Sequence, residues 1–410
     1  MPLGNWRAPD HVPTRLAQLP GEMPNSARGE KKQSQDKGEV KIMTHRVIDA
    51  DGHICETKEL WEEYVPSSYR DRTIRMDKDN NGCDRFWING IAYENSLSAR
   101  ACLPWGMDDP NNPPTWDDII PGSYDGKARL AVMDEEGLAH ALLFPSIYLR
   151  NGDITDANVA AATCHGYNEW ITDMCRDGAG RLDAVGLVPL QSVEAATKEV
   201  SHISNLGLKG ITFRPERYNG LALYDEALVP FWNAISASGL FVCVHGSFGV
   251  QMPSFANSRY TNRFFTHMIC HPFEQMAACL DIICGGVLER HPDLRVAFLE
   301  SGLGWLEYWL HRMDEHFEVM GSETPWLTRR PSELFREQCF ISIEADEAHR
   351  IPKLKALGLE HCIFWGADYP HFDCTYPGAV AELEEHLSPL EPLLANLVRH
   401  DNAARFIGLP

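Results

Sequence analysis

From residue 46 onward, short apolar runs alternate along the chain with segments in which apolar residues recur at helical spacing. The runs are rich in β-branched residues and mostly lack the polar alternation of a half-buried strand. That pattern is typical of strands buried on both faces, as in a parallel sheet. Eight strands are predicted, over residues 46–51, 139–145, 184–190, 209–214, 240–245, 294–300, 339–344 and 361–367.

Amphipathic helices are predicted between these strands, over about 126–137, 155–178, 191–206, 225–238, 271–291, 302–320 and 346–357, with helical stretches through 376–407. Ser192 or Gln191 suits a helix start, and Gly207 and Gly239 suit helix ends. Eight strand–helix units predict an α/β fold, a (β/α)8 TIM barrel. The alternative is a doubly wound open sheet, which would usually carry a G-x-G-x-x-G turn after a strand, and the chain has none.

Two long segments interrupt this rhythm. Residues 52–125 follow the first strand and are predicted to form an inserted lid or cap over the barrel mouth, with a hairpin at Asn89-Gly90. Residues 246–270 are predicted to be a second long loop. Tryptophans of the lid, such as Trp61, are candidates for an apolar substrate roof. The alternative is that they pack the lid onto the barrel.

Residues 1–45 are rich in Pro, Gly, Gln and Lys and show no periodicity, so we expect a disordered N-terminal arm, with an arm packed on a partner subunit as the alternative. A single barrel domain is therefore predicted over residues 46–410, with its boundary after residue 45. No apolar segment typical of a secretory signal precedes it.

Composition and charge narrow the class of protein. Hydrophobic residues make up 44% and charged residues 23% of the 410 positions, which is ordinary for a globular chain. The net charge is −21, from 37 basic and 58 acidic residues, and this opposes binding to nucleic acid or to an anionic membrane surface. No apolar run is long enough for a transmembrane helix. Twelve cysteines without a C-x-x-C pair favour a reduced, cytoplasmic setting.

The candidate chemistry lies where the predicted strands end, since catalytic groups of barrel enzymes come from the carboxyl ends of their strands. Five of the eight strands end in an acid or a histidine: Asp51 with His53, His245, Glu300, Glu344 and Asp368. A ring of such groups suits a divalent cation, because clustered carboxylates otherwise repel one another. Asp51, His53, His245 and Asp368 are the predicted ligands of zinc, iron or manganese.

Several stretches of the chain then resemble a known family: VIDADGHICE, FVCVHGS, RVAFLESGLGWLEYWLHRMDEH, FWGADYPHFD and NAARFIGL. Their order and their placement on predicted strands resemble the amidohydrolase-related family of the amidohydrolase superfamily. The similarity is to the branch that contains aminocarboxymuconate-semialdehyde decarboxylase and the resorcylate-type decarboxylases. The resemblance covers about 46–409.

The resemblance implies roles for individual residues. Asp51 and His53 match the first-strand motif, usually His-x-His, and His245 matches the fifth-strand ligand. Asp368 matches an aspartate that binds metal and acts as the base on bound water. Glu300 departs from the pattern, since the aminocarboxymuconate-semialdehyde enzyme has a catalytic histidine there. A homodimer is also expected from the family.

Glu300 is therefore interpreted as a general base or as a further ligand. With His271 and His245 it would hold a second ion, so one metal ion or two are left open. Two other residues are candidates for substrate binding. Arg214 would clamp a substrate carboxylate, or would pair with Glu216 or Asp225 instead. His371, just past Asp368, would contact the substrate.

Hydrolysis is the first functional interpretation. A metal-activated water would attack an amide, ester, lactone or thioester of a small organic or aromatic acid, with Asp368 and Glu300 as the catalytic residues. The alternative is metal-dependent nonoxidative decarboxylation of an aromatic or unsaturated carboxylic acid. A non-catalytic binding barrel is a further alternative, and it requires the ring of acids and histidines to be accidental.

Overall fold

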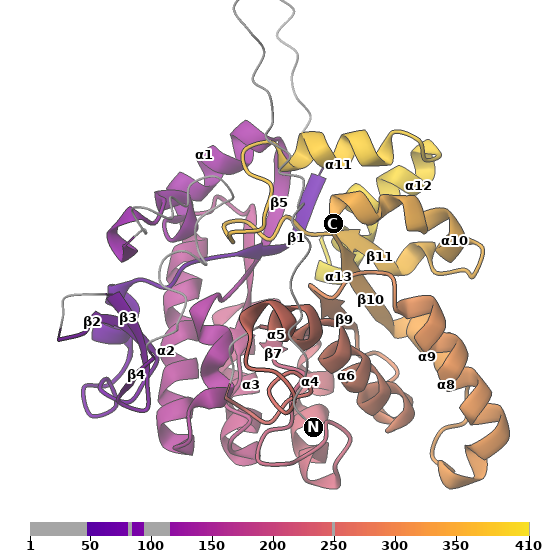
Figure 1. The fold of residues 1–410 in the computed structure, drawn as a ribbon, viewed down its shortest axis with the longest axis horizontal. Helices are drawn as coiled ribbons and strands as arrows, with labels where there is room; N and C mark the ends of the chain where they lie inside the picture. Colours follow the sequence, from indigo (N-terminus) through magenta and orange to yellow (C-terminus); the bar gives the residue numbers. More distant parts are fainter. Residues whose placement is uncertain (1–46, 81–83, 94–114, 248–250, 410) are drawn as a thin grey trace, which may run out of the picture. The chain divides into compact units, whose positions relative to one another are not determined.

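The computed structural model describes residues 47–80, 84–93, 115–247 and 251–409. Its main feature is a parallel sheet of eight strands in the order β1-β5-β6-β7-β8-β9-β10-β11 (Figure 1). The strands are β1 Val47–His53, β5 Leu138–Phe144, β6 Leu182–Leu187, β7 Gly210–Phe213, β8 Phe241–His245, β9 Val296–Leu299, β10 Cys339–Ile343 and β11 Ile363–Trp365. All eight predicted strands are confirmed.

The sheet curls into a nearly closed barrel. Neighbouring strands pair in parallel from β1 through β11. Beyond the end of β11, the backbone N–H of Asp368 donates to the carbonyl of Asp51 at 2.9 Å, and the N–H of His53 donates to the carbonyl of Tyr369 at 2.7 Å. These bonds join the last strand to the first. The predicted TIM barrel is therefore confirmed.

Helices surround the strands, as Figure 1 shows. They are α1 Gly126–Glu136, α2 Ala157–Arg176, α3 Val193–Leu206, α4 Val229–Ser238, α5 Arg263–Cys270, α6 Pro272–Cys284, α7 Val287–Arg290, α8 Leu306–Met320, α9 Pro331–Gln338, α10 Ile351–Lys355, α11 Ala379–Leu387, α12 Pro392–Asn396 and α13 Asn402–Ile407. Ser192 caps α3 by accepting from the N–H of Ala195, and Gly207 ends it at φ 82°. Gly239 ends α4 in the same way at φ 72°.

Two helices correct the sequence prediction. The segment 246–270 is not all loop, because α5 lies within it. Its apolar residues point outward, and Phe264 is 67% exposed, so the core-facing stripe that identifies most helices is missing here. Helix α9 was not predicted at all. It spans only eight residues, too few for a helical period to stand out from the loop before it.

The insertion after β1 contains a small antiparallel sheet of β2 Arg75–Lys78, β3 Asp84–Ile88 and β4 Ile91–Tyr93. The predicted hairpin is confirmed. Ile88 pairs with Ile91, while Asn89 and Gly90 take φ values of 56° and 77°, the left-handed conformation of a tight two-residue turn. The lid role of 52–125 stays a prediction, because 94–114 lie outside the described residues, as does the predicted arm over 1–45.

Helix α13 fills the amino-terminal end of the barrel. The Phe406 ring lies 4.4 Å from Phe241, 4.9 Å from Phe340 and 5.5 Å from Phe364, measured between ring centroids. This apolar plug leaves the opposite, carboxyl end of the strands for polar chemistry. Among the described helices, none has both the length and the hydropathy needed to cross a membrane.

Candidate active site and metal centre

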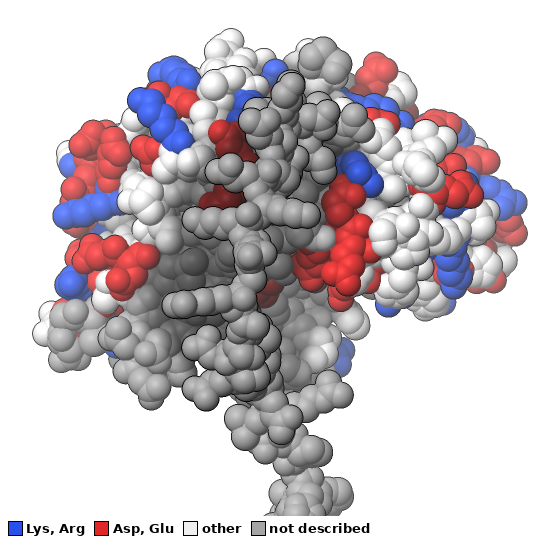
Figure 2. Space-filling view, turned by 90° about the horizontal axis from the view of Figure 1, so that it is seen from above, with Lys and Arg blue, Asp and Glu red and all other residues white. Residues whose placement is uncertain are grey.

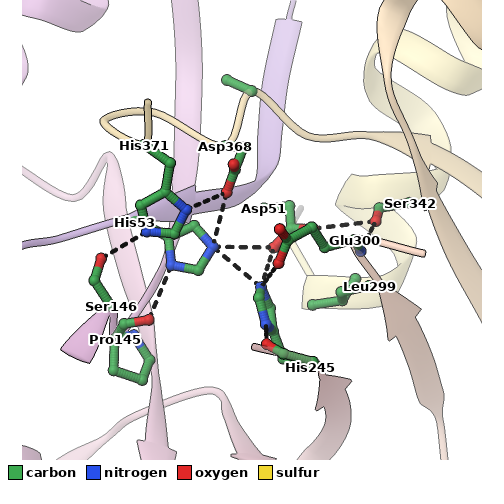
Figure 3. A network of polar contacts seen from close by, with 12 residues as sticks. Asp51, His53, Pro145, Ser146, His245, Leu299, Glu300, Ser342, Asp368 and His371 are labelled. Atoms are coloured by element: carbon green, nitrogen blue, oxygen red, sulfur yellow. Dashed lines mark hydrogen bonds and ion pairs between the residues drawn. The ribbon is translucent and has the colours of Figure 1, made fainter. Parts of the chain in front are cut away.

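Six polar side chains meet at the carboxyl end of the barrel (Figure 3). They come from strands hundreds of residues apart in sequence: Asp51 and His53 from β1, His245 from β8, Glu300 after β9, Ser342 from β10 and Asp368 after β11. Asp51, His53 and His245 offer three ligand atoms within 4.8 Å of one another, as a metal site requires, and all three are buried. The structure therefore brings together the four metal ligands predicted from the sequence.

The two histidines are held with their Nε2 atoms facing each other at 3.1 Å. Nδ1 of His53 donates to the carbonyl of Pro145 at 2.9 Å, and Nδ1 of His245 donates to the carbonyl of Gly246 at 2.6 Å. Burial, with the neighbouring histidines His371 and His245, holds the pKa of His53 well below its ordinary value, so this ring is uncharged. When both rings are neutral, two Nε2 lone pairs point into the same space.

The two aspartates complete the ring around that space. Oδ1 of Asp51 lies 3.3 Å from His245 Nε2 and 3.8 Å from His53 Nε2, and Oδ1 of Asp368 lies 3.2 Å from His53 Nε2. Oδ1 of Asp51 is buried without a hydrogen-bond partner, whereas Oδ1 of Asp368 also lies near His371. Two imidazole nitrogens and two carboxylate oxygens that converge on one space fit a bound cation.

His371 lies beside this ring and contacts Asp368. Its Nδ1 is 2.8 Å from Asp368 Oδ1, and its ring packs on that of His53 with 4.0 Å between centroids. Its Nε2 is 2.9 Å from Ser146 Oγ, whose own proton goes to the carbonyl of Ile54. His371 Nε2 therefore donates to Ser146. In a neutral ring protonated at Nε2, Nδ1 carries no proton. The 2.8 Å contact between His371 Nδ1 and Asp368 Oδ1 therefore requires one more proton, carried by Asp368 or by His371.

Glu300 pairs with His271 on the other side of the ring. Their Oε2 and Nδ1 atoms are 3.3 Å apart, and the same Oε2 is 3.7 Å from His245 Nε2. Burial opposes charge on Glu300, but the positive charge of His271 outweighs it and lowers the pKa of Glu300 to about 2. Burial likewise opposes charge on His271, yet Glu300 raises its pKa well above the usual range. The pair is a buried carboxylate and imidazolium.

The backbone is strained at two of these positions. Glu300 and Asp368 have φ values of 48° and 55°, a region that non-glycine residues rarely adopt. Such strain persists where surrounding contacts fix it, and it concentrates at functional sites. At Glu300 the backbone N–H donates to Ser342 Oγ at 3.0 Å, and Ser342 donates in turn to Asp51 Oδ2 at 3.1 Å. One serine thus links two acids of the site.

The buried carboxylate of Asp49 fixes the position of β1. Asp49 accepts from the N–H groups of Asp51 and Ala367, and lies 3.8 Å from the guanidinium of Arg129. Burial raises the pKa of Asp49 to about 6, although Arg129 opposes the shift. Gly52 must be glycine here, because a Cβ would come within 2.6 Å of the Asp49 carboxylate.

Two predicted substrate-binding residues lie elsewhere. Arg214 is fully buried and forms a two-point pair with Glu216, with Nε 3.0 Å from Oε2 and Nη2 2.5 Å from Oε1, which is the alternative left open by the sequence. Trp61 is 3% exposed and belongs to the hydrophobic core, so its indole is used in packing. Their roles toward a substrate gain no support from these positions.

A cavity of about 280 Å³ opens beside Asp51, Glu300 and Asp368. Its lining contains seven acids and no lysine or arginine; the other acids are Glu344, Asp346, Asp373 and Glu382. Burial, together with the neighbouring Glu347, raises the pKa of Glu344 to about 7. Figure 2 shows acidic side chains gathered into a contiguous area on one face of the molecule.

Sequence analysis missed Ser342, Ser146 and Arg129. Ser342 stands within the apolar run CFISI of β10, and this lone hydroxyl on a buried strand was the available signal. Arg129 donates to the carbonyl of His53 at 2.9 Å while 1% exposed. A single arginine in the amphipathic stretch of α1 gives no sign of such burial.

Comparisons with known proteins agree with this geometry. The model of the amidohydrolase family matches residues 48–409. A curated relative, 2-amino-3-carboxymuconate-6-semialdehyde decarboxylase of Dictyostelium discoideum, is 26% identical over 245 residues, which are 59% of this chain and 65% of the relative, just under two thirds of its length.

Two solved structures share the fold. An amidohydrolase from Mycobacterium avium subsp. paratuberculosis has a TM-score of 0.75 at 20% identity, covering 88% of this chain and 99% of its own. A 5-carboxyvanillate decarboxylase from Novosphingobium aromaticivorans, with bound manganese and a nitrobenzoic acid, has a TM-score of 0.64 at 15% identity, covering 90% and 98%.

Proposed function

The chain belongs to the amidohydrolase family, and from this premise we propose that it is a metal-dependent nonoxidative decarboxylase of a small aromatic or unsaturated carboxylic acid. Sequence analysis placed hydrolysis first and decarboxylation second. The order is reversed here because the curated relative and one of the similar structures are decarboxylases. The substrate class is taken from those relatives.

The observation that carries the proposal is the convergence of His53 Nε2, His245 Nε2 and the Oδ1 atoms of Asp51 and Asp368. Two imidazoles and two carboxylates suit zinc, iron or manganese. A cation bound there would hold the substrate's carboxylate and a neighbouring hydroxyl in one orientation. The acidic cavity supports a cation at this position, because seven acids and no lysine or arginine are among its lining residues.

The protein's own contribution is a proton for carbon. In nonoxidative decarboxylation the bond between the substrate carbon and its carboxylate breaks, carbon dioxide leaves, and a proton takes its place on that carbon. The pair of Asp368 and His371 holds a proton at its 2.8 Å contact, beside the cavity. Burial raises the pKa of Asp368 well above its ordinary value, and Glu300 adds to the effect, so this carboxyl is suited to act as the acid.

Hydrolysis remains the second candidate, because Glu300 stands where the aminocarboxymuconate-semialdehyde enzyme has a histidine. An ionised carboxylate 3.7 Å from His245 Nε2 is placed to accept a proton from a water molecule. Decarboxylation needs no such base.

Product analysis separates the two reactions. Purified full-length protein is loaded with manganese or zinc and incubated in deuterated water with hydroxylated benzoic acids and with esters and lactones of similar size. Carbon dioxide release, with one deuterium on the product carbon and loss of activity on chelation, is the expected result. Turnover of the esters or lactones without carbon dioxide would overturn the proposal in favour of hydrolysis.

A further inference from the structure

A second cluster of metal-binding side chains lies outside the barrel, on α2 and α3. His165 and Glu169 are four residues apart on α2, and Glu199 and His202 are three residues apart on α3. These spacings place each pair on one face of its helix. The His165 and His202 rings stack across the helix–helix boundary with 4.0 Å between centroids. The cluster therefore joins two helices and has no residue in common with the active site.

Three ligand atoms of this cluster lie within 4.8 Å of one another, one each from His165, Glu169 and His202. Oε1 of Glu169 is 3.6 Å from His165 Nε2 and 3.9 Å from His202 Nε2. Ligands around a tetrahedral zinc ion are about 3.3–3.5 Å apart, given bonds of about 2.0–2.2 Å. The two distances to Glu169 Oε1 exceed this range by only a few tenths of an ångström.

Glu199 fixes the tautomer of His165 that could bind a metal ion. It is 8% exposed, and its Oε1 accepts from the side-chain amide of Asn168 at 2.8 Å. Its Oε2 accepts from Nδ1 of His165 at 3.4 Å, which leaves the lone pair of His165 on Nε2, toward Glu169. A carboxylate behind a histidine is the usual support of a metal-ligating imidazole.

An independent observation concerns His202. Its Nε2 is a buried atom without a hydrogen-bond partner, and it lies 3.9 Å from Glu169 Oε1. A buried ring nitrogen near a carboxylate, on a ring that stacks with a second imidazole, points to a cation as the missing partner.

We propose that His165, Glu169 and His202 form a second, non-catalytic zinc site that ties α2 to α3, with Glu199 as the positioning residue behind His165. Two imidazoles and one carboxylate favour zinc over calcium or magnesium, which prefer all-oxygen sites. The fourth position is open to water. The site binds zinc whether or not the proposed decarboxylation is correct, because none of its residues touches the active site.

The test counts metal ions in tag-free, full-length protein whose active site is already loaded with manganese. Zinc is added, excess is removed by gel filtration, and total manganese plus zinc per chain is measured by mass spectrometry. Wild type is expected to hold one equivalent more than His202→Ala, and zinc is expected to raise the unfolding temperature of wild type only. His245→Ala should show the opposite pattern, losing the active-site equivalent and keeping the exterior one.

His311→Ala is the matched control, since His311 and Glu315 form an exposed pair with the same four-residue spacing and a 3.6 Å contact. It should behave as wild type. Glu169→Gln provides a second variant, expected to weaken zinc binding at least tenfold with an unchanged circular dichroism spectrum. Equal zinc content in wild type, His202→Ala and Glu169→Gln would overturn the proposal, whatever the outcome for the active site.

Discussion

The Nε2 atoms of His53 and His245 face each other at 3.1 Å, although each ring has already committed its Nδ1 proton to a backbone carbonyl. Two neutral imidazoles in this arrangement repel each other unless something positive lies between them. The nearest oxygens, Asp51 Oδ1 and Asp368 Oδ1, are acceptors as well. When both rings are neutral, the proposed cation would relieve this repulsion.

His245→Ala tests this relationship directly. The variant should lose the active-site metal and at least 99% of activity, because one metal ligand is removed. It should remain folded, because the repulsion between the two Nε2 lone pairs is removed as well. In protein loaded with manganese and not exposed to zinc, chelation should lower the unfolding temperature of wild type and leave that of the variant unchanged. Metal content per chain and thermal unfolding with and without chelator are the measurements. His361→Ala, an exposed histidine, is the control. With manganese as the only metal supplied, a full manganese equivalent in His245→Ala would contradict the assignment.

Glu300→Gln distinguishes a reactive carboxylate from a ligand. If the reaction is hydrolysis with Glu300 as the base, turnover should fall about 10²–10⁴-fold with metal content unchanged, the range typical of losing a general acid or base. Decarboxylation, for which Asp368 is the proposed acid, should be affected much less. The variant also removes the charge that keeps His271 protonated, so the pKa of His271 should fall and the pH profile should shift with it. Steady-state rates from pH 5 to 9 and metal analysis provide the test. Loss of one metal equivalent would instead identify Glu300 as a ligand, in line with a two-ion site.

The convergence of Asp51, His245 and Asp368 could be predicted because each ends a continuous apolar run. Parallel strands of a closed barrel bring their carboxyl ends together whatever their separation in sequence. The polar residue at each strand end is therefore visible without coordinates.

The contacts that fix these groups could not be predicted. Ser342 bridges Asp51 and Glu300 only because β10 lies next to β9 and is separated from β1 by β11 alone in the closed ring. Gly366 is required because a Cβ there would lie 2.2 Å from the Cβ of Asp51, a proximity that follows from barrel closure. Neither residue differs in the sequence from an ordinary serine or glycine near a strand end.

Substitution of Arg214 tests whether this residue forms a structural ion pair with Glu216 or binds a carboxylate of the substrate. Arg214→Met leaves Glu216 buried and unpaired, so the free energy of unfolding should fall by about 3–5 kcal/mol. The KM of the remaining folded enzyme should not change. The double variant Arg214→Met/Glu216→Leu should recover much of the lost stability, because no charge is then stranded. Urea unfolding and steady-state kinetics measure the two effects. A raised KM with unchanged stability would instead favour the clamp.

The buried carboxyl group of Glu56 makes the stability of the fold decrease as the pH rises. Its carboxylate is 0% exposed and accepts from the N–H groups of Ser146, Ile147 and Tyr148. Burial outweighs these bonds and raises its pKa from 4.5 to about 7. Between these values the folded chain retains a proton that the unfolded chain has released. Its contribution to stability is therefore fully present below pH 4.5 and is lost as the pH rises to about 7.

The loss attributable to Glu56 amounts to roughly 3 kcal/mol at most, from 1.36 kcal/mol per pKa unit. Glu56→Gln removes the titrating group, so its unfolding free energy should change less between pH 5 and pH 8 than that of wild type. Gln still accepts through one oxygen but turns an amide toward backbone donors, so the variant should be the less stable protein at pH 5. Urea unfolding at both pH values, with the exposed Glu63→Gln as control, measures the difference. Parallel pH profiles for wild type and Glu56→Gln would show that Glu56 is ionised throughout this range in the folded protein.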